Sequence, residues 1–524
     1  MTGGFLQLAA TSNAETFLTT NPQISFFKSV FRKYTRFALE SIDELGTDTA
    51  LNKFTTTKFT IKVPRNGDLL TGAYLVFNLP AIYSGITSDT NLKTYNFKWV
   101  KNLASHIIRE ATLKIGGVKV DSLSGEWINV HKELMASDEE KRLGAKLYGS
   151  VPELYDPENA PGNNGNYPHI RSSYTNDTNG VGFDNILLSE VSTETTFPSI
   201  PAATLKIPLP FFFSGKTGLA LPLIALQYHE VTIDFTLAPL YDLFTVIDTT
   251  PNSTSYGKRV KVTTALDGNL GFEKFTKDTN FISSETLEIT GKTEFVYAFL
   301  DTEERKRFAA FEHEYLITQV NRQNSIVGVT STEYSFKISS NNPTQYIVVI
   351  PKRDDQGALN QWNNYTNWLD EVPPHSSEYR VADQLYDTTN NRVPFYTKSY
   401  STSSDLKPSN SKRDIIETMT LKLNGSKRFK ERNKEFFLYQ QPLQHFKNCP
   451  QIHGIYVYSF SLEAGNDQPT GACDFSVFNE KYLDITANIP EITDYTYKVN
   501  YDVYTVSYNV LKILSGMGSL VFAY

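Results

Sequence analysis

Short runs of alternating or fully apolar residues, each ended by Pro, Gly or a polar cluster, constrain the fold of this chain most strongly. Examples in the first half are FTTTKFTIKVP, LLTGAYLVFNLP and ATLKIGGVKVDSL, and examples in the second half are TQYIVVIPK, ETMTLKLNG and GIYVYSFSL. Runs of this length and spacing are typical of β-strands. Strands of this kind pack as antiparallel sandwiches, so the sequence predicts an all-β protein.

The composition supports the same fold class. The chain has 524 residues, with 34 Phe and 30 Tyr against only 4 Met and 4 Trp, and aromatic residues are favoured on pleated, half-buried surfaces. A prior of roughly 100–200 residues per domain predicts two to four domains or two large β domains. The formal net charge of −7 argues against a protein whose whole surface binds nucleic acid, because that surface would have to be basic.

The cysteine count and the N-terminus bear on the compartment. The two cysteines, Cys449 and Cys473, are too few for a disulfide framework, so we expect free thiols in a reducing compartment. The N-terminal stretch MTGGFLQLAATSNAETF lacks the pattern of a secretory signal peptide, and no segment has the ~20 apolar residues that a membrane span needs. We therefore expect a soluble chain that is not exported by the usual route.

The stretch TNPQISFFKSVFRKYTRFALE predicts an N-terminal helix. Asn21 would cap it, Pro22 suits its first turn, and apolar residues from Phe27 to Ala38 recur on one side. Lys28, Arg32 and Arg36 share a neighbouring flank, at a spacing of four residues. The helix would either pack its aromatic side on the body with the bases in solvent, or present the bases to an anionic partner such as a membrane surface.

Changes of composition along the chain predict three parts. Residues 1–40 form an arm with the short basic helix, residues 41–245 form a first sandwich with a polar insertion around 136–200, and residues 246–524 form a second sandwich with a polar insertion around 353–412. Polar excursions of this length within a folded domain are usually functional surface or disordered. We also expect helices in GEWINVHKELM and in DTEERKRFAAFEHEYL.

The fragment Gly215-Lys216-Thr217 matches the end of a phosphate-binding loop but not its beginning. The first glycine of that pattern is replaced by Pro210, and Pro222 falls where the following helix would run. We therefore predict a turn between strands, with Lys216 in solvent.

Other enzyme signatures are incomplete in the same way. SGMGS near the C-terminus has Val521 in place of the third glycine of a dinucleotide fingerprint, and we predict a turn there. His313 would need a second histidine at position 317 for a zinc motif, and that residue is Ile317. The sequence thus predicts no catalytic residue, no metal site and no cofactor.

Four asparagines begin an Asn-x-Ser/Thr triplet. Asn176, Asn252 and Asn364 lie in polar stretches and are candidates for glycan attachment. Asn424, in LNGSK, is better explained as a hairpin turn.

Seven blocks of sequence follow one another from residue 3 to residue 524. They are GGFLQLAA…FLTTNPQISFFKSVFRKYTRFALE, PRNGDLLTGAYLVFNLP, IGGVKVDSLSGEWINVHKEL, IPLPFFFSGKTGLALPLIALQYHEVTIDF, LDTEERKRFAAFEHEYLI, GIYVYSFSLEAGNDQPTGACDFS and YNVLKILSGMGSLVFAY. In this order they resemble the major capsid proteins of nucleocytoplasmic large DNA viruses. The resemblance leaves out the two polar insertions.

The resemblance implies a double jelly roll, that is, two eight-stranded antiparallel β-sandwiches in one chain. It implies a structural subunit and not an enzyme, which forms pseudo-hexagonal homotrimers that tile the icosahedral shell of a large double-stranded DNA virus. Implied partners are further copies of the chain, minor capsid and penton proteins and an inner viral membrane, without sequence-specific nucleic acid binding. Implied inner-face candidates are Lys28, Arg32, Lys33 and Arg36, and the chain would be made and assembled in the cytoplasm of the infected cell and reside in the virion capsid.

Two other classes of function remain open from the residues alone. Aromatic residues in a polar loop, Trp362, Tyr365 and Trp368, would suit a carbohydrate-binding or adhesive β-sandwich. A jelly-roll hydrolase is the third alternative, because paired carboxylates on a sandwich leave no sequence spacing to detect.

Overall fold

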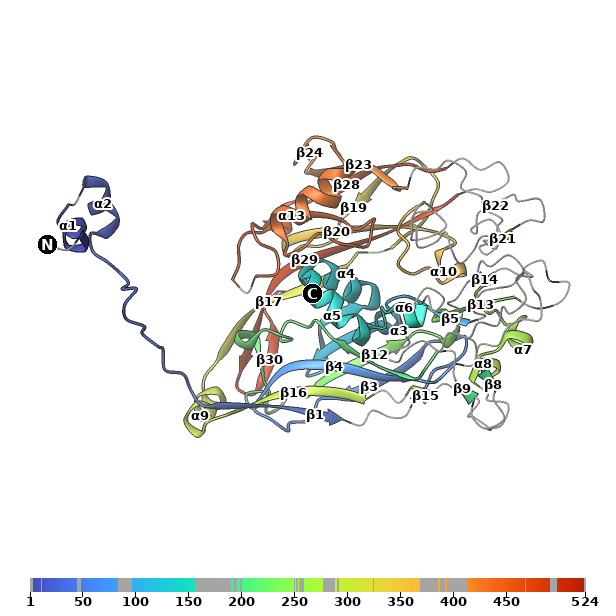
Figure 1. The fold of residues 1–524 in the computed structure, drawn as a ribbon, viewed down its shortest axis with the longest axis horizontal. Helices are drawn as coiled ribbons and strands as arrows, with labels where there is room; N and C mark the ends of the chain where they lie inside the picture. The colour runs from blue at the N-terminus through green and yellow to red at the C-terminus, as the bar shows by residue number, and fades with distance from the viewer. Residues whose placement is uncertain are drawn as a thin grey trace.

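A computed structural model shows antiparallel sheets that form an elongated body, from which the N-terminal residues extend as an arm (Figure 1). The structure describes residues 3–522 except 11, 45–48, 83–96, 156–189, 192–195, 198–199, 249, 251–252, 254–258, 277–287, 290–291, 324, 368–384, 387–391, 394–412, 467 and 491–496. No helix among the described residues is long and apolar enough to cross a membrane.

Two antiparallel sheets, each with a main path of four strands, form the core of the first half. One has the order β1 (Phe37–Glu44), β16 (Lys292–Leu300), β4 (Leu69–Leu79), β10 (Ala203–Pro208), and the other has the order β3 (Thr57–Lys62), β12 (Val231–Leu237), β6 (Ile108–Ile115), β7 (Val118–Ser124). Burial alternates strictly along β12, as expected when a strand turns one face to the core and the other outward.

The second half repeats this arrangement. Its sheets have the orders β17 (His313–Arg322), β29 (Val499–Leu514), β20 (Pro343–Arg353), β26 (Tyr456–Ser459) and β19 (Glu333–Lys337), β28 (Lys481–Ala487), β23 (Ile416–Leu423), β24 (Ser426–Lys427). Each half therefore contains a pair of antiparallel sheets whose main path has four strands, and three of the four sheets carry short additional strands. This is the double jelly roll that the sequence predicts.

The pairing of β16 corrects the predicted domain boundary. This strand lies after residue 246 in sequence, yet it pairs with β1 along its whole length and with β4 on its other side. Residues up to Leu300 therefore belong to the first half, because β16 lies between β1 and β4 in the first sheet. The next strand, β17, pairs with β29 of the second half. The boundary predicted between residues 245 and 246 is thus placed too early.

Helices lie between the sandwiches and at both ends of the body (Figure 1). α4 (Gly125–Met135) confirms the helix predicted in GEWINVHKELM, and α5 (Asp138–Tyr148) follows as a separate helix with a capping box at Ser137 and Glu140. α9 (Thr302–Ala310) begins at Asp301 as predicted, but it is shorter than DTEERKRFAAFEHEYL. From His313 onward the chain pairs with β29 as strand β17, so tertiary pairing determines the structure there.

The predicted turns occur where expected. Asn424 and Gly425 both have positive φ between β23 and β24, and Ser515 and Gly516 have positive φ between β29 and β30 (Met517–Leu520). Two-residue hairpin turns need this conformation.

The remaining elements are short. They are β2 (Thr49–Ala50), β5 (Phe97–Trp99), β8 (Glu190–Val191), β9 (Thr196–Phe197), β11 (Leu221–Pro222), β13 (Phe244–Ile247), β14 (Arg259–Val260), β15 (Glu288–Ile289), β18 (Ile326–Val329), β21 (Leu385–Tyr386), β22 (Arg392–Val393), β25 (Arg432–Asn433), β27 (Cys473–Asp474), α3 (Leu103–Ile107), α6 (Pro152–Tyr155), α7 (Asp267–Leu270), α8 (Glu273–Thr276), α10 (Gln356–Leu359) and α13 (Gln441–His445), besides the short helices Thr217–Leu219, Leu240–Asp242, Phe436–Gln440 and Phe475–Val477.

The helix predicted from Asn21 onward does not form. The arm contains α1 (Gly3–Ala9) and α2 (Asn13–Thr19), and the chain from residue 20 to residue 36 has no helix. Asn21 has a positive φ of 55°, so it follows the end of α2 and does not cap a new helix. No part of the body covers the aromatic side chains, and Phe27 is 98% exposed, so the packing that stabilises most protein helices is missing.

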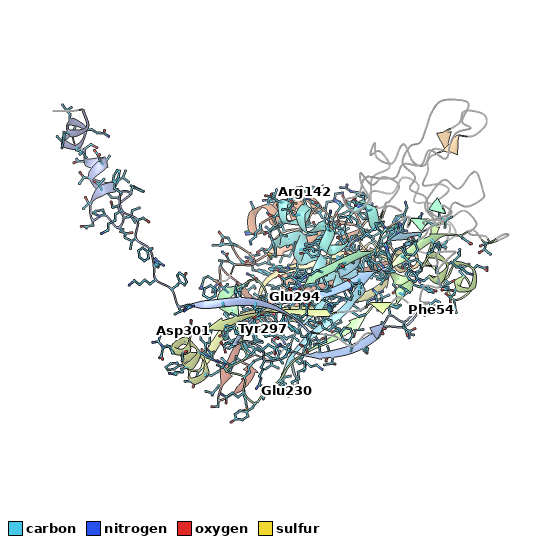
Figure 2. The ribbon with its side chains drawn as sticks, turned by 60° about the horizontal axis from the view of Figure 1, so that its bottom comes forward. Phe54, Arg142, Glu230, Glu294, Tyr297 and Asp301 are labelled. Atoms are coloured by element: carbon cyan, nitrogen blue, oxygen red, sulfur yellow. The ribbon has the colours of Figure 1, made fainter. Side chains whose placement is uncertain are left out.

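The two ends of the body differ. The arm and α9 lie at one end, and the short strands β8, β9, β21 and β22 of the two polar insertions lie at the other (Figure 1). Figure 2 shows the same polarity, with Asp301 near the departing arm and Phe54 at the far end.

Candidate functional site: the seam between the two halves

The two halves of the described chain meet over a contact that contains both an apolar cluster and paired charged side chains. We call this contact the seam. It is built on the sheet β17-β29-β20-β26, whose central strands are buried on both faces. In β20, Tyr346, Val348 and Ile350 belong to a core cluster that spans both halves, whereas Ile347 and Val349 belong to the core of the second half alone. This two-sided burial explains the continuous apolar run in the sequence.

Helix α4 provides the first half's side of the seam. Its Trp127 is 1% exposed, and its ring lies 5.2 Å from that of Tyr504 and 6.4 Å from that of Tyr346. Ser124 caps the helix by accepting a hydrogen bond from the Trp127 amide. The cap and the aromatic cluster fix α4 against the second half.

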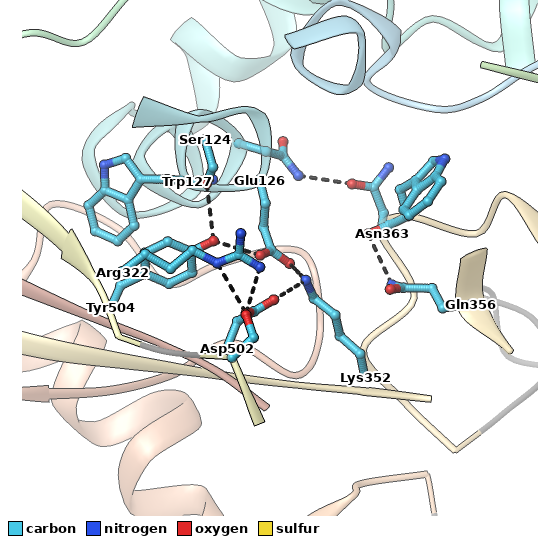
Figure 3. A network of polar contacts seen from close by, with 12 residues as sticks. Ser124, Glu126, Trp127, Arg322, Lys352, Gln356, Asn363, Asp502 and Tyr504 are labelled. Atoms are coloured by element: carbon cyan, nitrogen blue, oxygen red, sulfur yellow. Dashed lines mark hydrogen bonds and ion pairs between the residues drawn. The ribbon is translucent and has the colours of Figure 1, made fainter. Parts of the chain in front are cut away.

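Four charged side chains meet beside this aromatic cluster (Figure 3). Lys352 Nζ lies 2.5 Å from Glu126 Oε1 and 2.5 Å from Asp502 Oδ2, so one ammonium joins a carboxylate of the first half to one of the second. Arg322 also pairs with Asp502, at 2.7 Å, and Tyr504 donates a hydrogen bond of 2.7 Å to Glu126. A buried ion cluster is tolerated only when each charge is paired in this way.

Burial and pairing shift the pKa values of the cluster in opposite directions. Burial raises the pKa of Glu126, although Lys352 acts against it. Burial also acts to raise the pKa of Asp502, but Lys352 and Arg322 outweigh it and hold that pKa below its usual range. Burial acts to lower the pKa of Lys352, and the two carboxylates outweigh it, so the pKa is raised and the amine stays charged.

A second polar contact crosses the seam between β7 and β17. Asp121 is 1% exposed and accepts hydrogen bonds from the amides of Ser122, at 2.9 Å, and Val320, at 3.3 Å. Gln319 of β17 donates a hydrogen bond to the carbonyl of Val120. Burial raises the pKa of Asp121 to about 7, and the two amides oppose the shift.

A cavity of about 110 Å³ lies at the seam, lined in part by His106, Arg109, Glu126 and Lys352. Its charged groups are already paired, since Arg109 contacts Asp242 and also lies 4.5 Å from the ring of Trp362. Burial lowers the pKa of His106 to about 3, so the imidazole is neutral. Among the described residues no group of three His, Cys, Asp or Glu side chains could hold a metal. The arrangement joins two bodies and does not resemble an acid–base pair.

The predicted basic residues lie far from the seam. Lys28, Arg32, Lys33 and Arg36 are all exposed on the extended arm, and the structure does not bring them together on one face of a helix. Whether they contact a partner stays a prediction.

The predicted glycan site at Asn364 is corrected by the structure. Its side chain is 3% exposed and accepts hydrogen bonds from the amide and hydroxyl of Thr366, because residues 360–367 fold back onto the first half instead of forming a surface loop. Asn176 and Asn252 lie outside the described residues.

The aromatic loop that suggested carbohydrate binding also turns inward. Trp362 donates a hydrogen bond to the carbonyl of Asp242, and Tyr365 is 1% exposed. Trp368 lies outside the described residues. Two of the three aromatic residues are therefore packed in the body and offer no sugar platform.

The fragment at Gly215 is a turn, as predicted, since Gly215 has a positive φ of 74°. Lys216 is not simply in solvent, however. It is half-buried, and its ammonium donates to the carbonyl of Gly465 at 3.4 Å, which adds another contact between the halves. Cys449 and Cys473 are both free thiols, partly buried.

Sequence reasoning missed the seam residues Glu126, Arg322, Lys352, Asp502 and Tyr504. One signal was present, because Asp502 interrupts an apolar run, in VNYDVYTV, and Lys352 directly follows one within the same strand, in YIVVIPKR. A charge in a strand that is buried on both faces must be paired. The partner could not be read from the sequence, because it comes from the other half.

Comparisons with known proteins agree with this architecture. A family described as "Major capsid protein N-terminus" matches residues 25–267, and one described as "Large eukaryotic DNA virus major capsid protein" matches residues 304–519. The chain is 29% identical to the major capsid protein of Phaeocystis pouchetii virus and 28% identical to that of Paramecium bursaria Chlorella virus 1, over the full length of each pair.

Solved structures show the same fold. The capsid protein VP54 of PBCV-1 superposes with a TM-score of 0.62 at 24% identity, covering 95% of this chain and all of that chain. The Faustovirus major capsid protein has a TM-score of 0.62 at 13% identity, covering 96% and 95%. The curated relatives are structural proteins and not enzymes. The chain therefore belongs to the double jelly-roll family of major capsid proteins of nucleocytoplasmic large DNA viruses.

Proposed function

We propose that three copies of this chain form a homotrimeric capsomer with a pseudo-hexagonal outline, and that these capsomers tile the icosahedral shell of a large double-stranded DNA virus. The observation that carries the proposal is the repeated sheet order in the two halves. Three chains with two similar bodies each place six similar bodies around a threefold axis, and a block of that outline fills a surface without gaps.

The seam supports this role because it makes the two bodies one rigid unit. The core cluster that spans both halves and the Glu126–Lys352–Asp502 bridge fix the angle between them. A tile must keep its outline while it forms contacts on several sides. An obligate trimer interface typically buries more than roughly 2,000 Å² with an apolar centre, and contacts between capsomers would be weaker and reversible.

The polarity of the body suggests an orientation in the shell. The strands of the two polar insertions lie opposite the arm (Figure 1), so the insertions would crown the outer face and the arm would point inward. There Lys28, Arg32, Lys33 and Arg36 would face anionic groups, either of an inner membrane or of minor capsid and penton proteins. Each base near an anionic surface contributes about 1 kcal/mol.

Light scattering after size-exclusion chromatography, with negative-stain images of the main peak, tests the capsomer proposal. We expect a stable trimer with a hexagonal outline. A monodisperse monomer at every concentration would contradict it.

Replacing Lys28, Arg32 and Arg36 with Glu tests the membrane contact separately. We expect the trimer to persist, because its interfaces would lie on the bodies, and flotation with phosphatidylserine-containing vesicles to fall. Unchanged flotation would reject the membrane contact.

A further inference from the structure

The most unusual unpaired feature of the described chain is the free edge of β1 together with the five residues before it. β1 is the outermost strand of its sheet, and every second residue of such a strand points its backbone N–H and C=O groups away from its neighbour. Phe37 and Leu39 on this strand are 55% and 57% exposed. We call residues 32–44 the edge segment.

The edge segment has few of the features that normally protect a sheet edge. Natural edge strands are usually blocked by charged side chains, by Pro, by a bulge or by a covering element. Of these the edge segment has only charged side chains, three bases and three acids. β1 contains no Pro, pairs with β16 without a break in register, and is exposed at its first five residues. It lies along the margin of the body, continuous with the extended arm (Figure 1). A further strand can therefore be added to it.

The sequence of the edge segment, RKYTRFALESIDE, is complementary to itself when two copies run antiparallel with Ala38 opposite Ala38. In that register each base meets an acid: Arg32 meets Glu44, Lys33 meets Asp43, and Arg36 meets Glu40. The uncharged pairs match as well, since Tyr34 meets Ile42, Thr35 meets Ser41 and Phe37 meets Leu39. Directly opposed pairs of opposite charge and of apolar residues stabilise antiparallel strands.

The charges of the edge segment are not used within one chain. Arg32, Lys33, Arg36, Glu40 and Glu44 form no ion pair with any other described residue, and Asp43 reaches only Lys292, at 3.9 Å between two exposed side chains. Three bases are thus followed by three acids, and of these six groups only Asp43 has an ion-pair partner within the described chain, at 3.9 Å. A second copy of the chain supplies all six partners at once.

We propose that two copies of this chain join edge to edge through residues 32–44, in an antiparallel pairing centred on Ala38. The pairing makes one continuous sheet of β16 and β1 from each copy. Because each copy contributes the same residues, the contact has twofold symmetry. It cannot form around the threefold axis of a trimer, so it links chains of neighbouring capsomers; in this respect it rests on the proposed function.

A lipid surface fits these observations less well than a second copy. An anionic membrane would attract the three bases but repel Glu40, Asp43 and Glu44. For residues 32–44 the membrane contact and the edge pairing are therefore alternatives, and base-dependent vesicle binding without dimer formation through this segment would count against the edge pairing.

Cysteine cross-linking of the full chain tests the register. Ala38→Cys should form a disulfide-linked dimer with oxidised glutathione, because two copies of residue 38 face each other at the axis. Ser41→Cys is the matched control on the same strand. It should not link to itself, but should link to Thr35→Cys when the two variants are mixed.

Charge reversal tests the complementarity. The variants Arg32→Glu/Lys33→Glu/Arg36→Glu and Glu40→Lys/Asp43→Lys/Glu44→Lys should each lose self-linking through Ala38→Cys by more than about tenfold, since opposed charges become like charges. A mixture of the two should link again, because one edge is now wholly acidic and the other wholly basic. A membrane contact would predict no such rescue, and vesicle flotation that depends on the bases without any rescue would overturn the proposal.

The molar mass of the same samples, measured by light scattering after size-exclusion chromatography, shows whether the trimer forms independently of the edge pairing. It therefore separates a failure of this inference from a failure of the proposed function. Trimers without linking above the Ser41→Cys level would overturn the edge pairing and leave the capsomer intact. Monomers without linking would overturn both.

Discussion

The seam and the edge segment both carry bases and acids on strands of similar sheets, yet they differ in where the partners come from. At the seam, Lys352 lies between Glu126 and Asp502 inside one chain, and these three side chains are only 6–17% exposed. In the edge segment, three bases and three acids follow one another along an exposed strand. The comparison indicates that the charges of the seam are completed by folding and those of the edge segment by association.

Removing the central charge of the seam should have the largest effect on stability. Lys352→Met leaves Glu126 and Asp502 without their shared partner, and breaking a buried ion pair typically costs about 3–5 kcal/mol. The midpoint of denaturant unfolding should fall accordingly. The control is Lys422→Met, which removes a more exposed pair with Asp484 and should cost less than about 1 kcal/mol. Equal losses in the two variants would mean that the seam has no special role.

The same truncation made at both sites should separate buried from exposed packing. Leu511 of β29 is 0% exposed in the cluster that spans both halves, so Leu511→Ala should cost about 2–5 kcal/mol. Leu39→Ala in the edge segment should change the stability of the single chain by no more than about 0.5 kcal/mol while lowering association. A large loss of thermal stability from Leu39→Ala in dilute protein would show that β1 is packed within one chain.

The pH dependence of stability should come from the seam at Asp121. Its pKa is raised to about 7 by burial, so the stabilising effect of its protonated form is present below the ordinary pKa near 3.8 and is lost as the pH rises through about 7. Each pKa unit corresponds to about 1.4 kcal/mol. Asp121→Asn keeps the acceptor for the Val320 amide and should flatten the stability profile between pH 4 and 7 in unfolding experiments; an unchanged profile would argue against a protonated carboxyl.

Salt should give the smallest effect, and it should act on one region only. At about 1 M salt the Debye length falls to about 3 Å, which weakens exposed charge pairs far more than buried ones. Cross-linking through Ala38→Cys should therefore decrease while the unfolding midpoint hardly changes. A parallel decrease of both would contradict the assignment of the edge charges to association.

The parts of the structure that depend on local sequence were predictable. The strands follow from period-two runs, and the hairpin at Asn424 follows from an Asn-Gly pair. The helix predicted from Asn21 was wrong because its apolar side has nothing in the chain to pack on. Asn364 was misplaced because the polar composition of its loop hides eight residues that are folded inward.

The seam could not be predicted for a different reason. Glu126, Lys352 and Asp502 are distant in sequence, and their meeting depends on how the two halves dock. The isolated charges in buried strands were a detectable signal of pairing, but they name no partner. The opposite holds for the edge segment, since its complementarity can be read in thirteen consecutive residues once the structure shows that the edge is free.

Hydrogen–deuterium exchange of the full-length chain, measured on dilute and on assembled protein, tests the comparison most directly. We expect the amides of β20 and β29 to be protected in both samples, whereas those of Arg32–Arg36 should become protected only on assembly and lose that protection when their bases are reversed. Free exchange at Arg32–Arg36 in the assembled protein, or seam amides that exchange freely until copies associate, would contradict it.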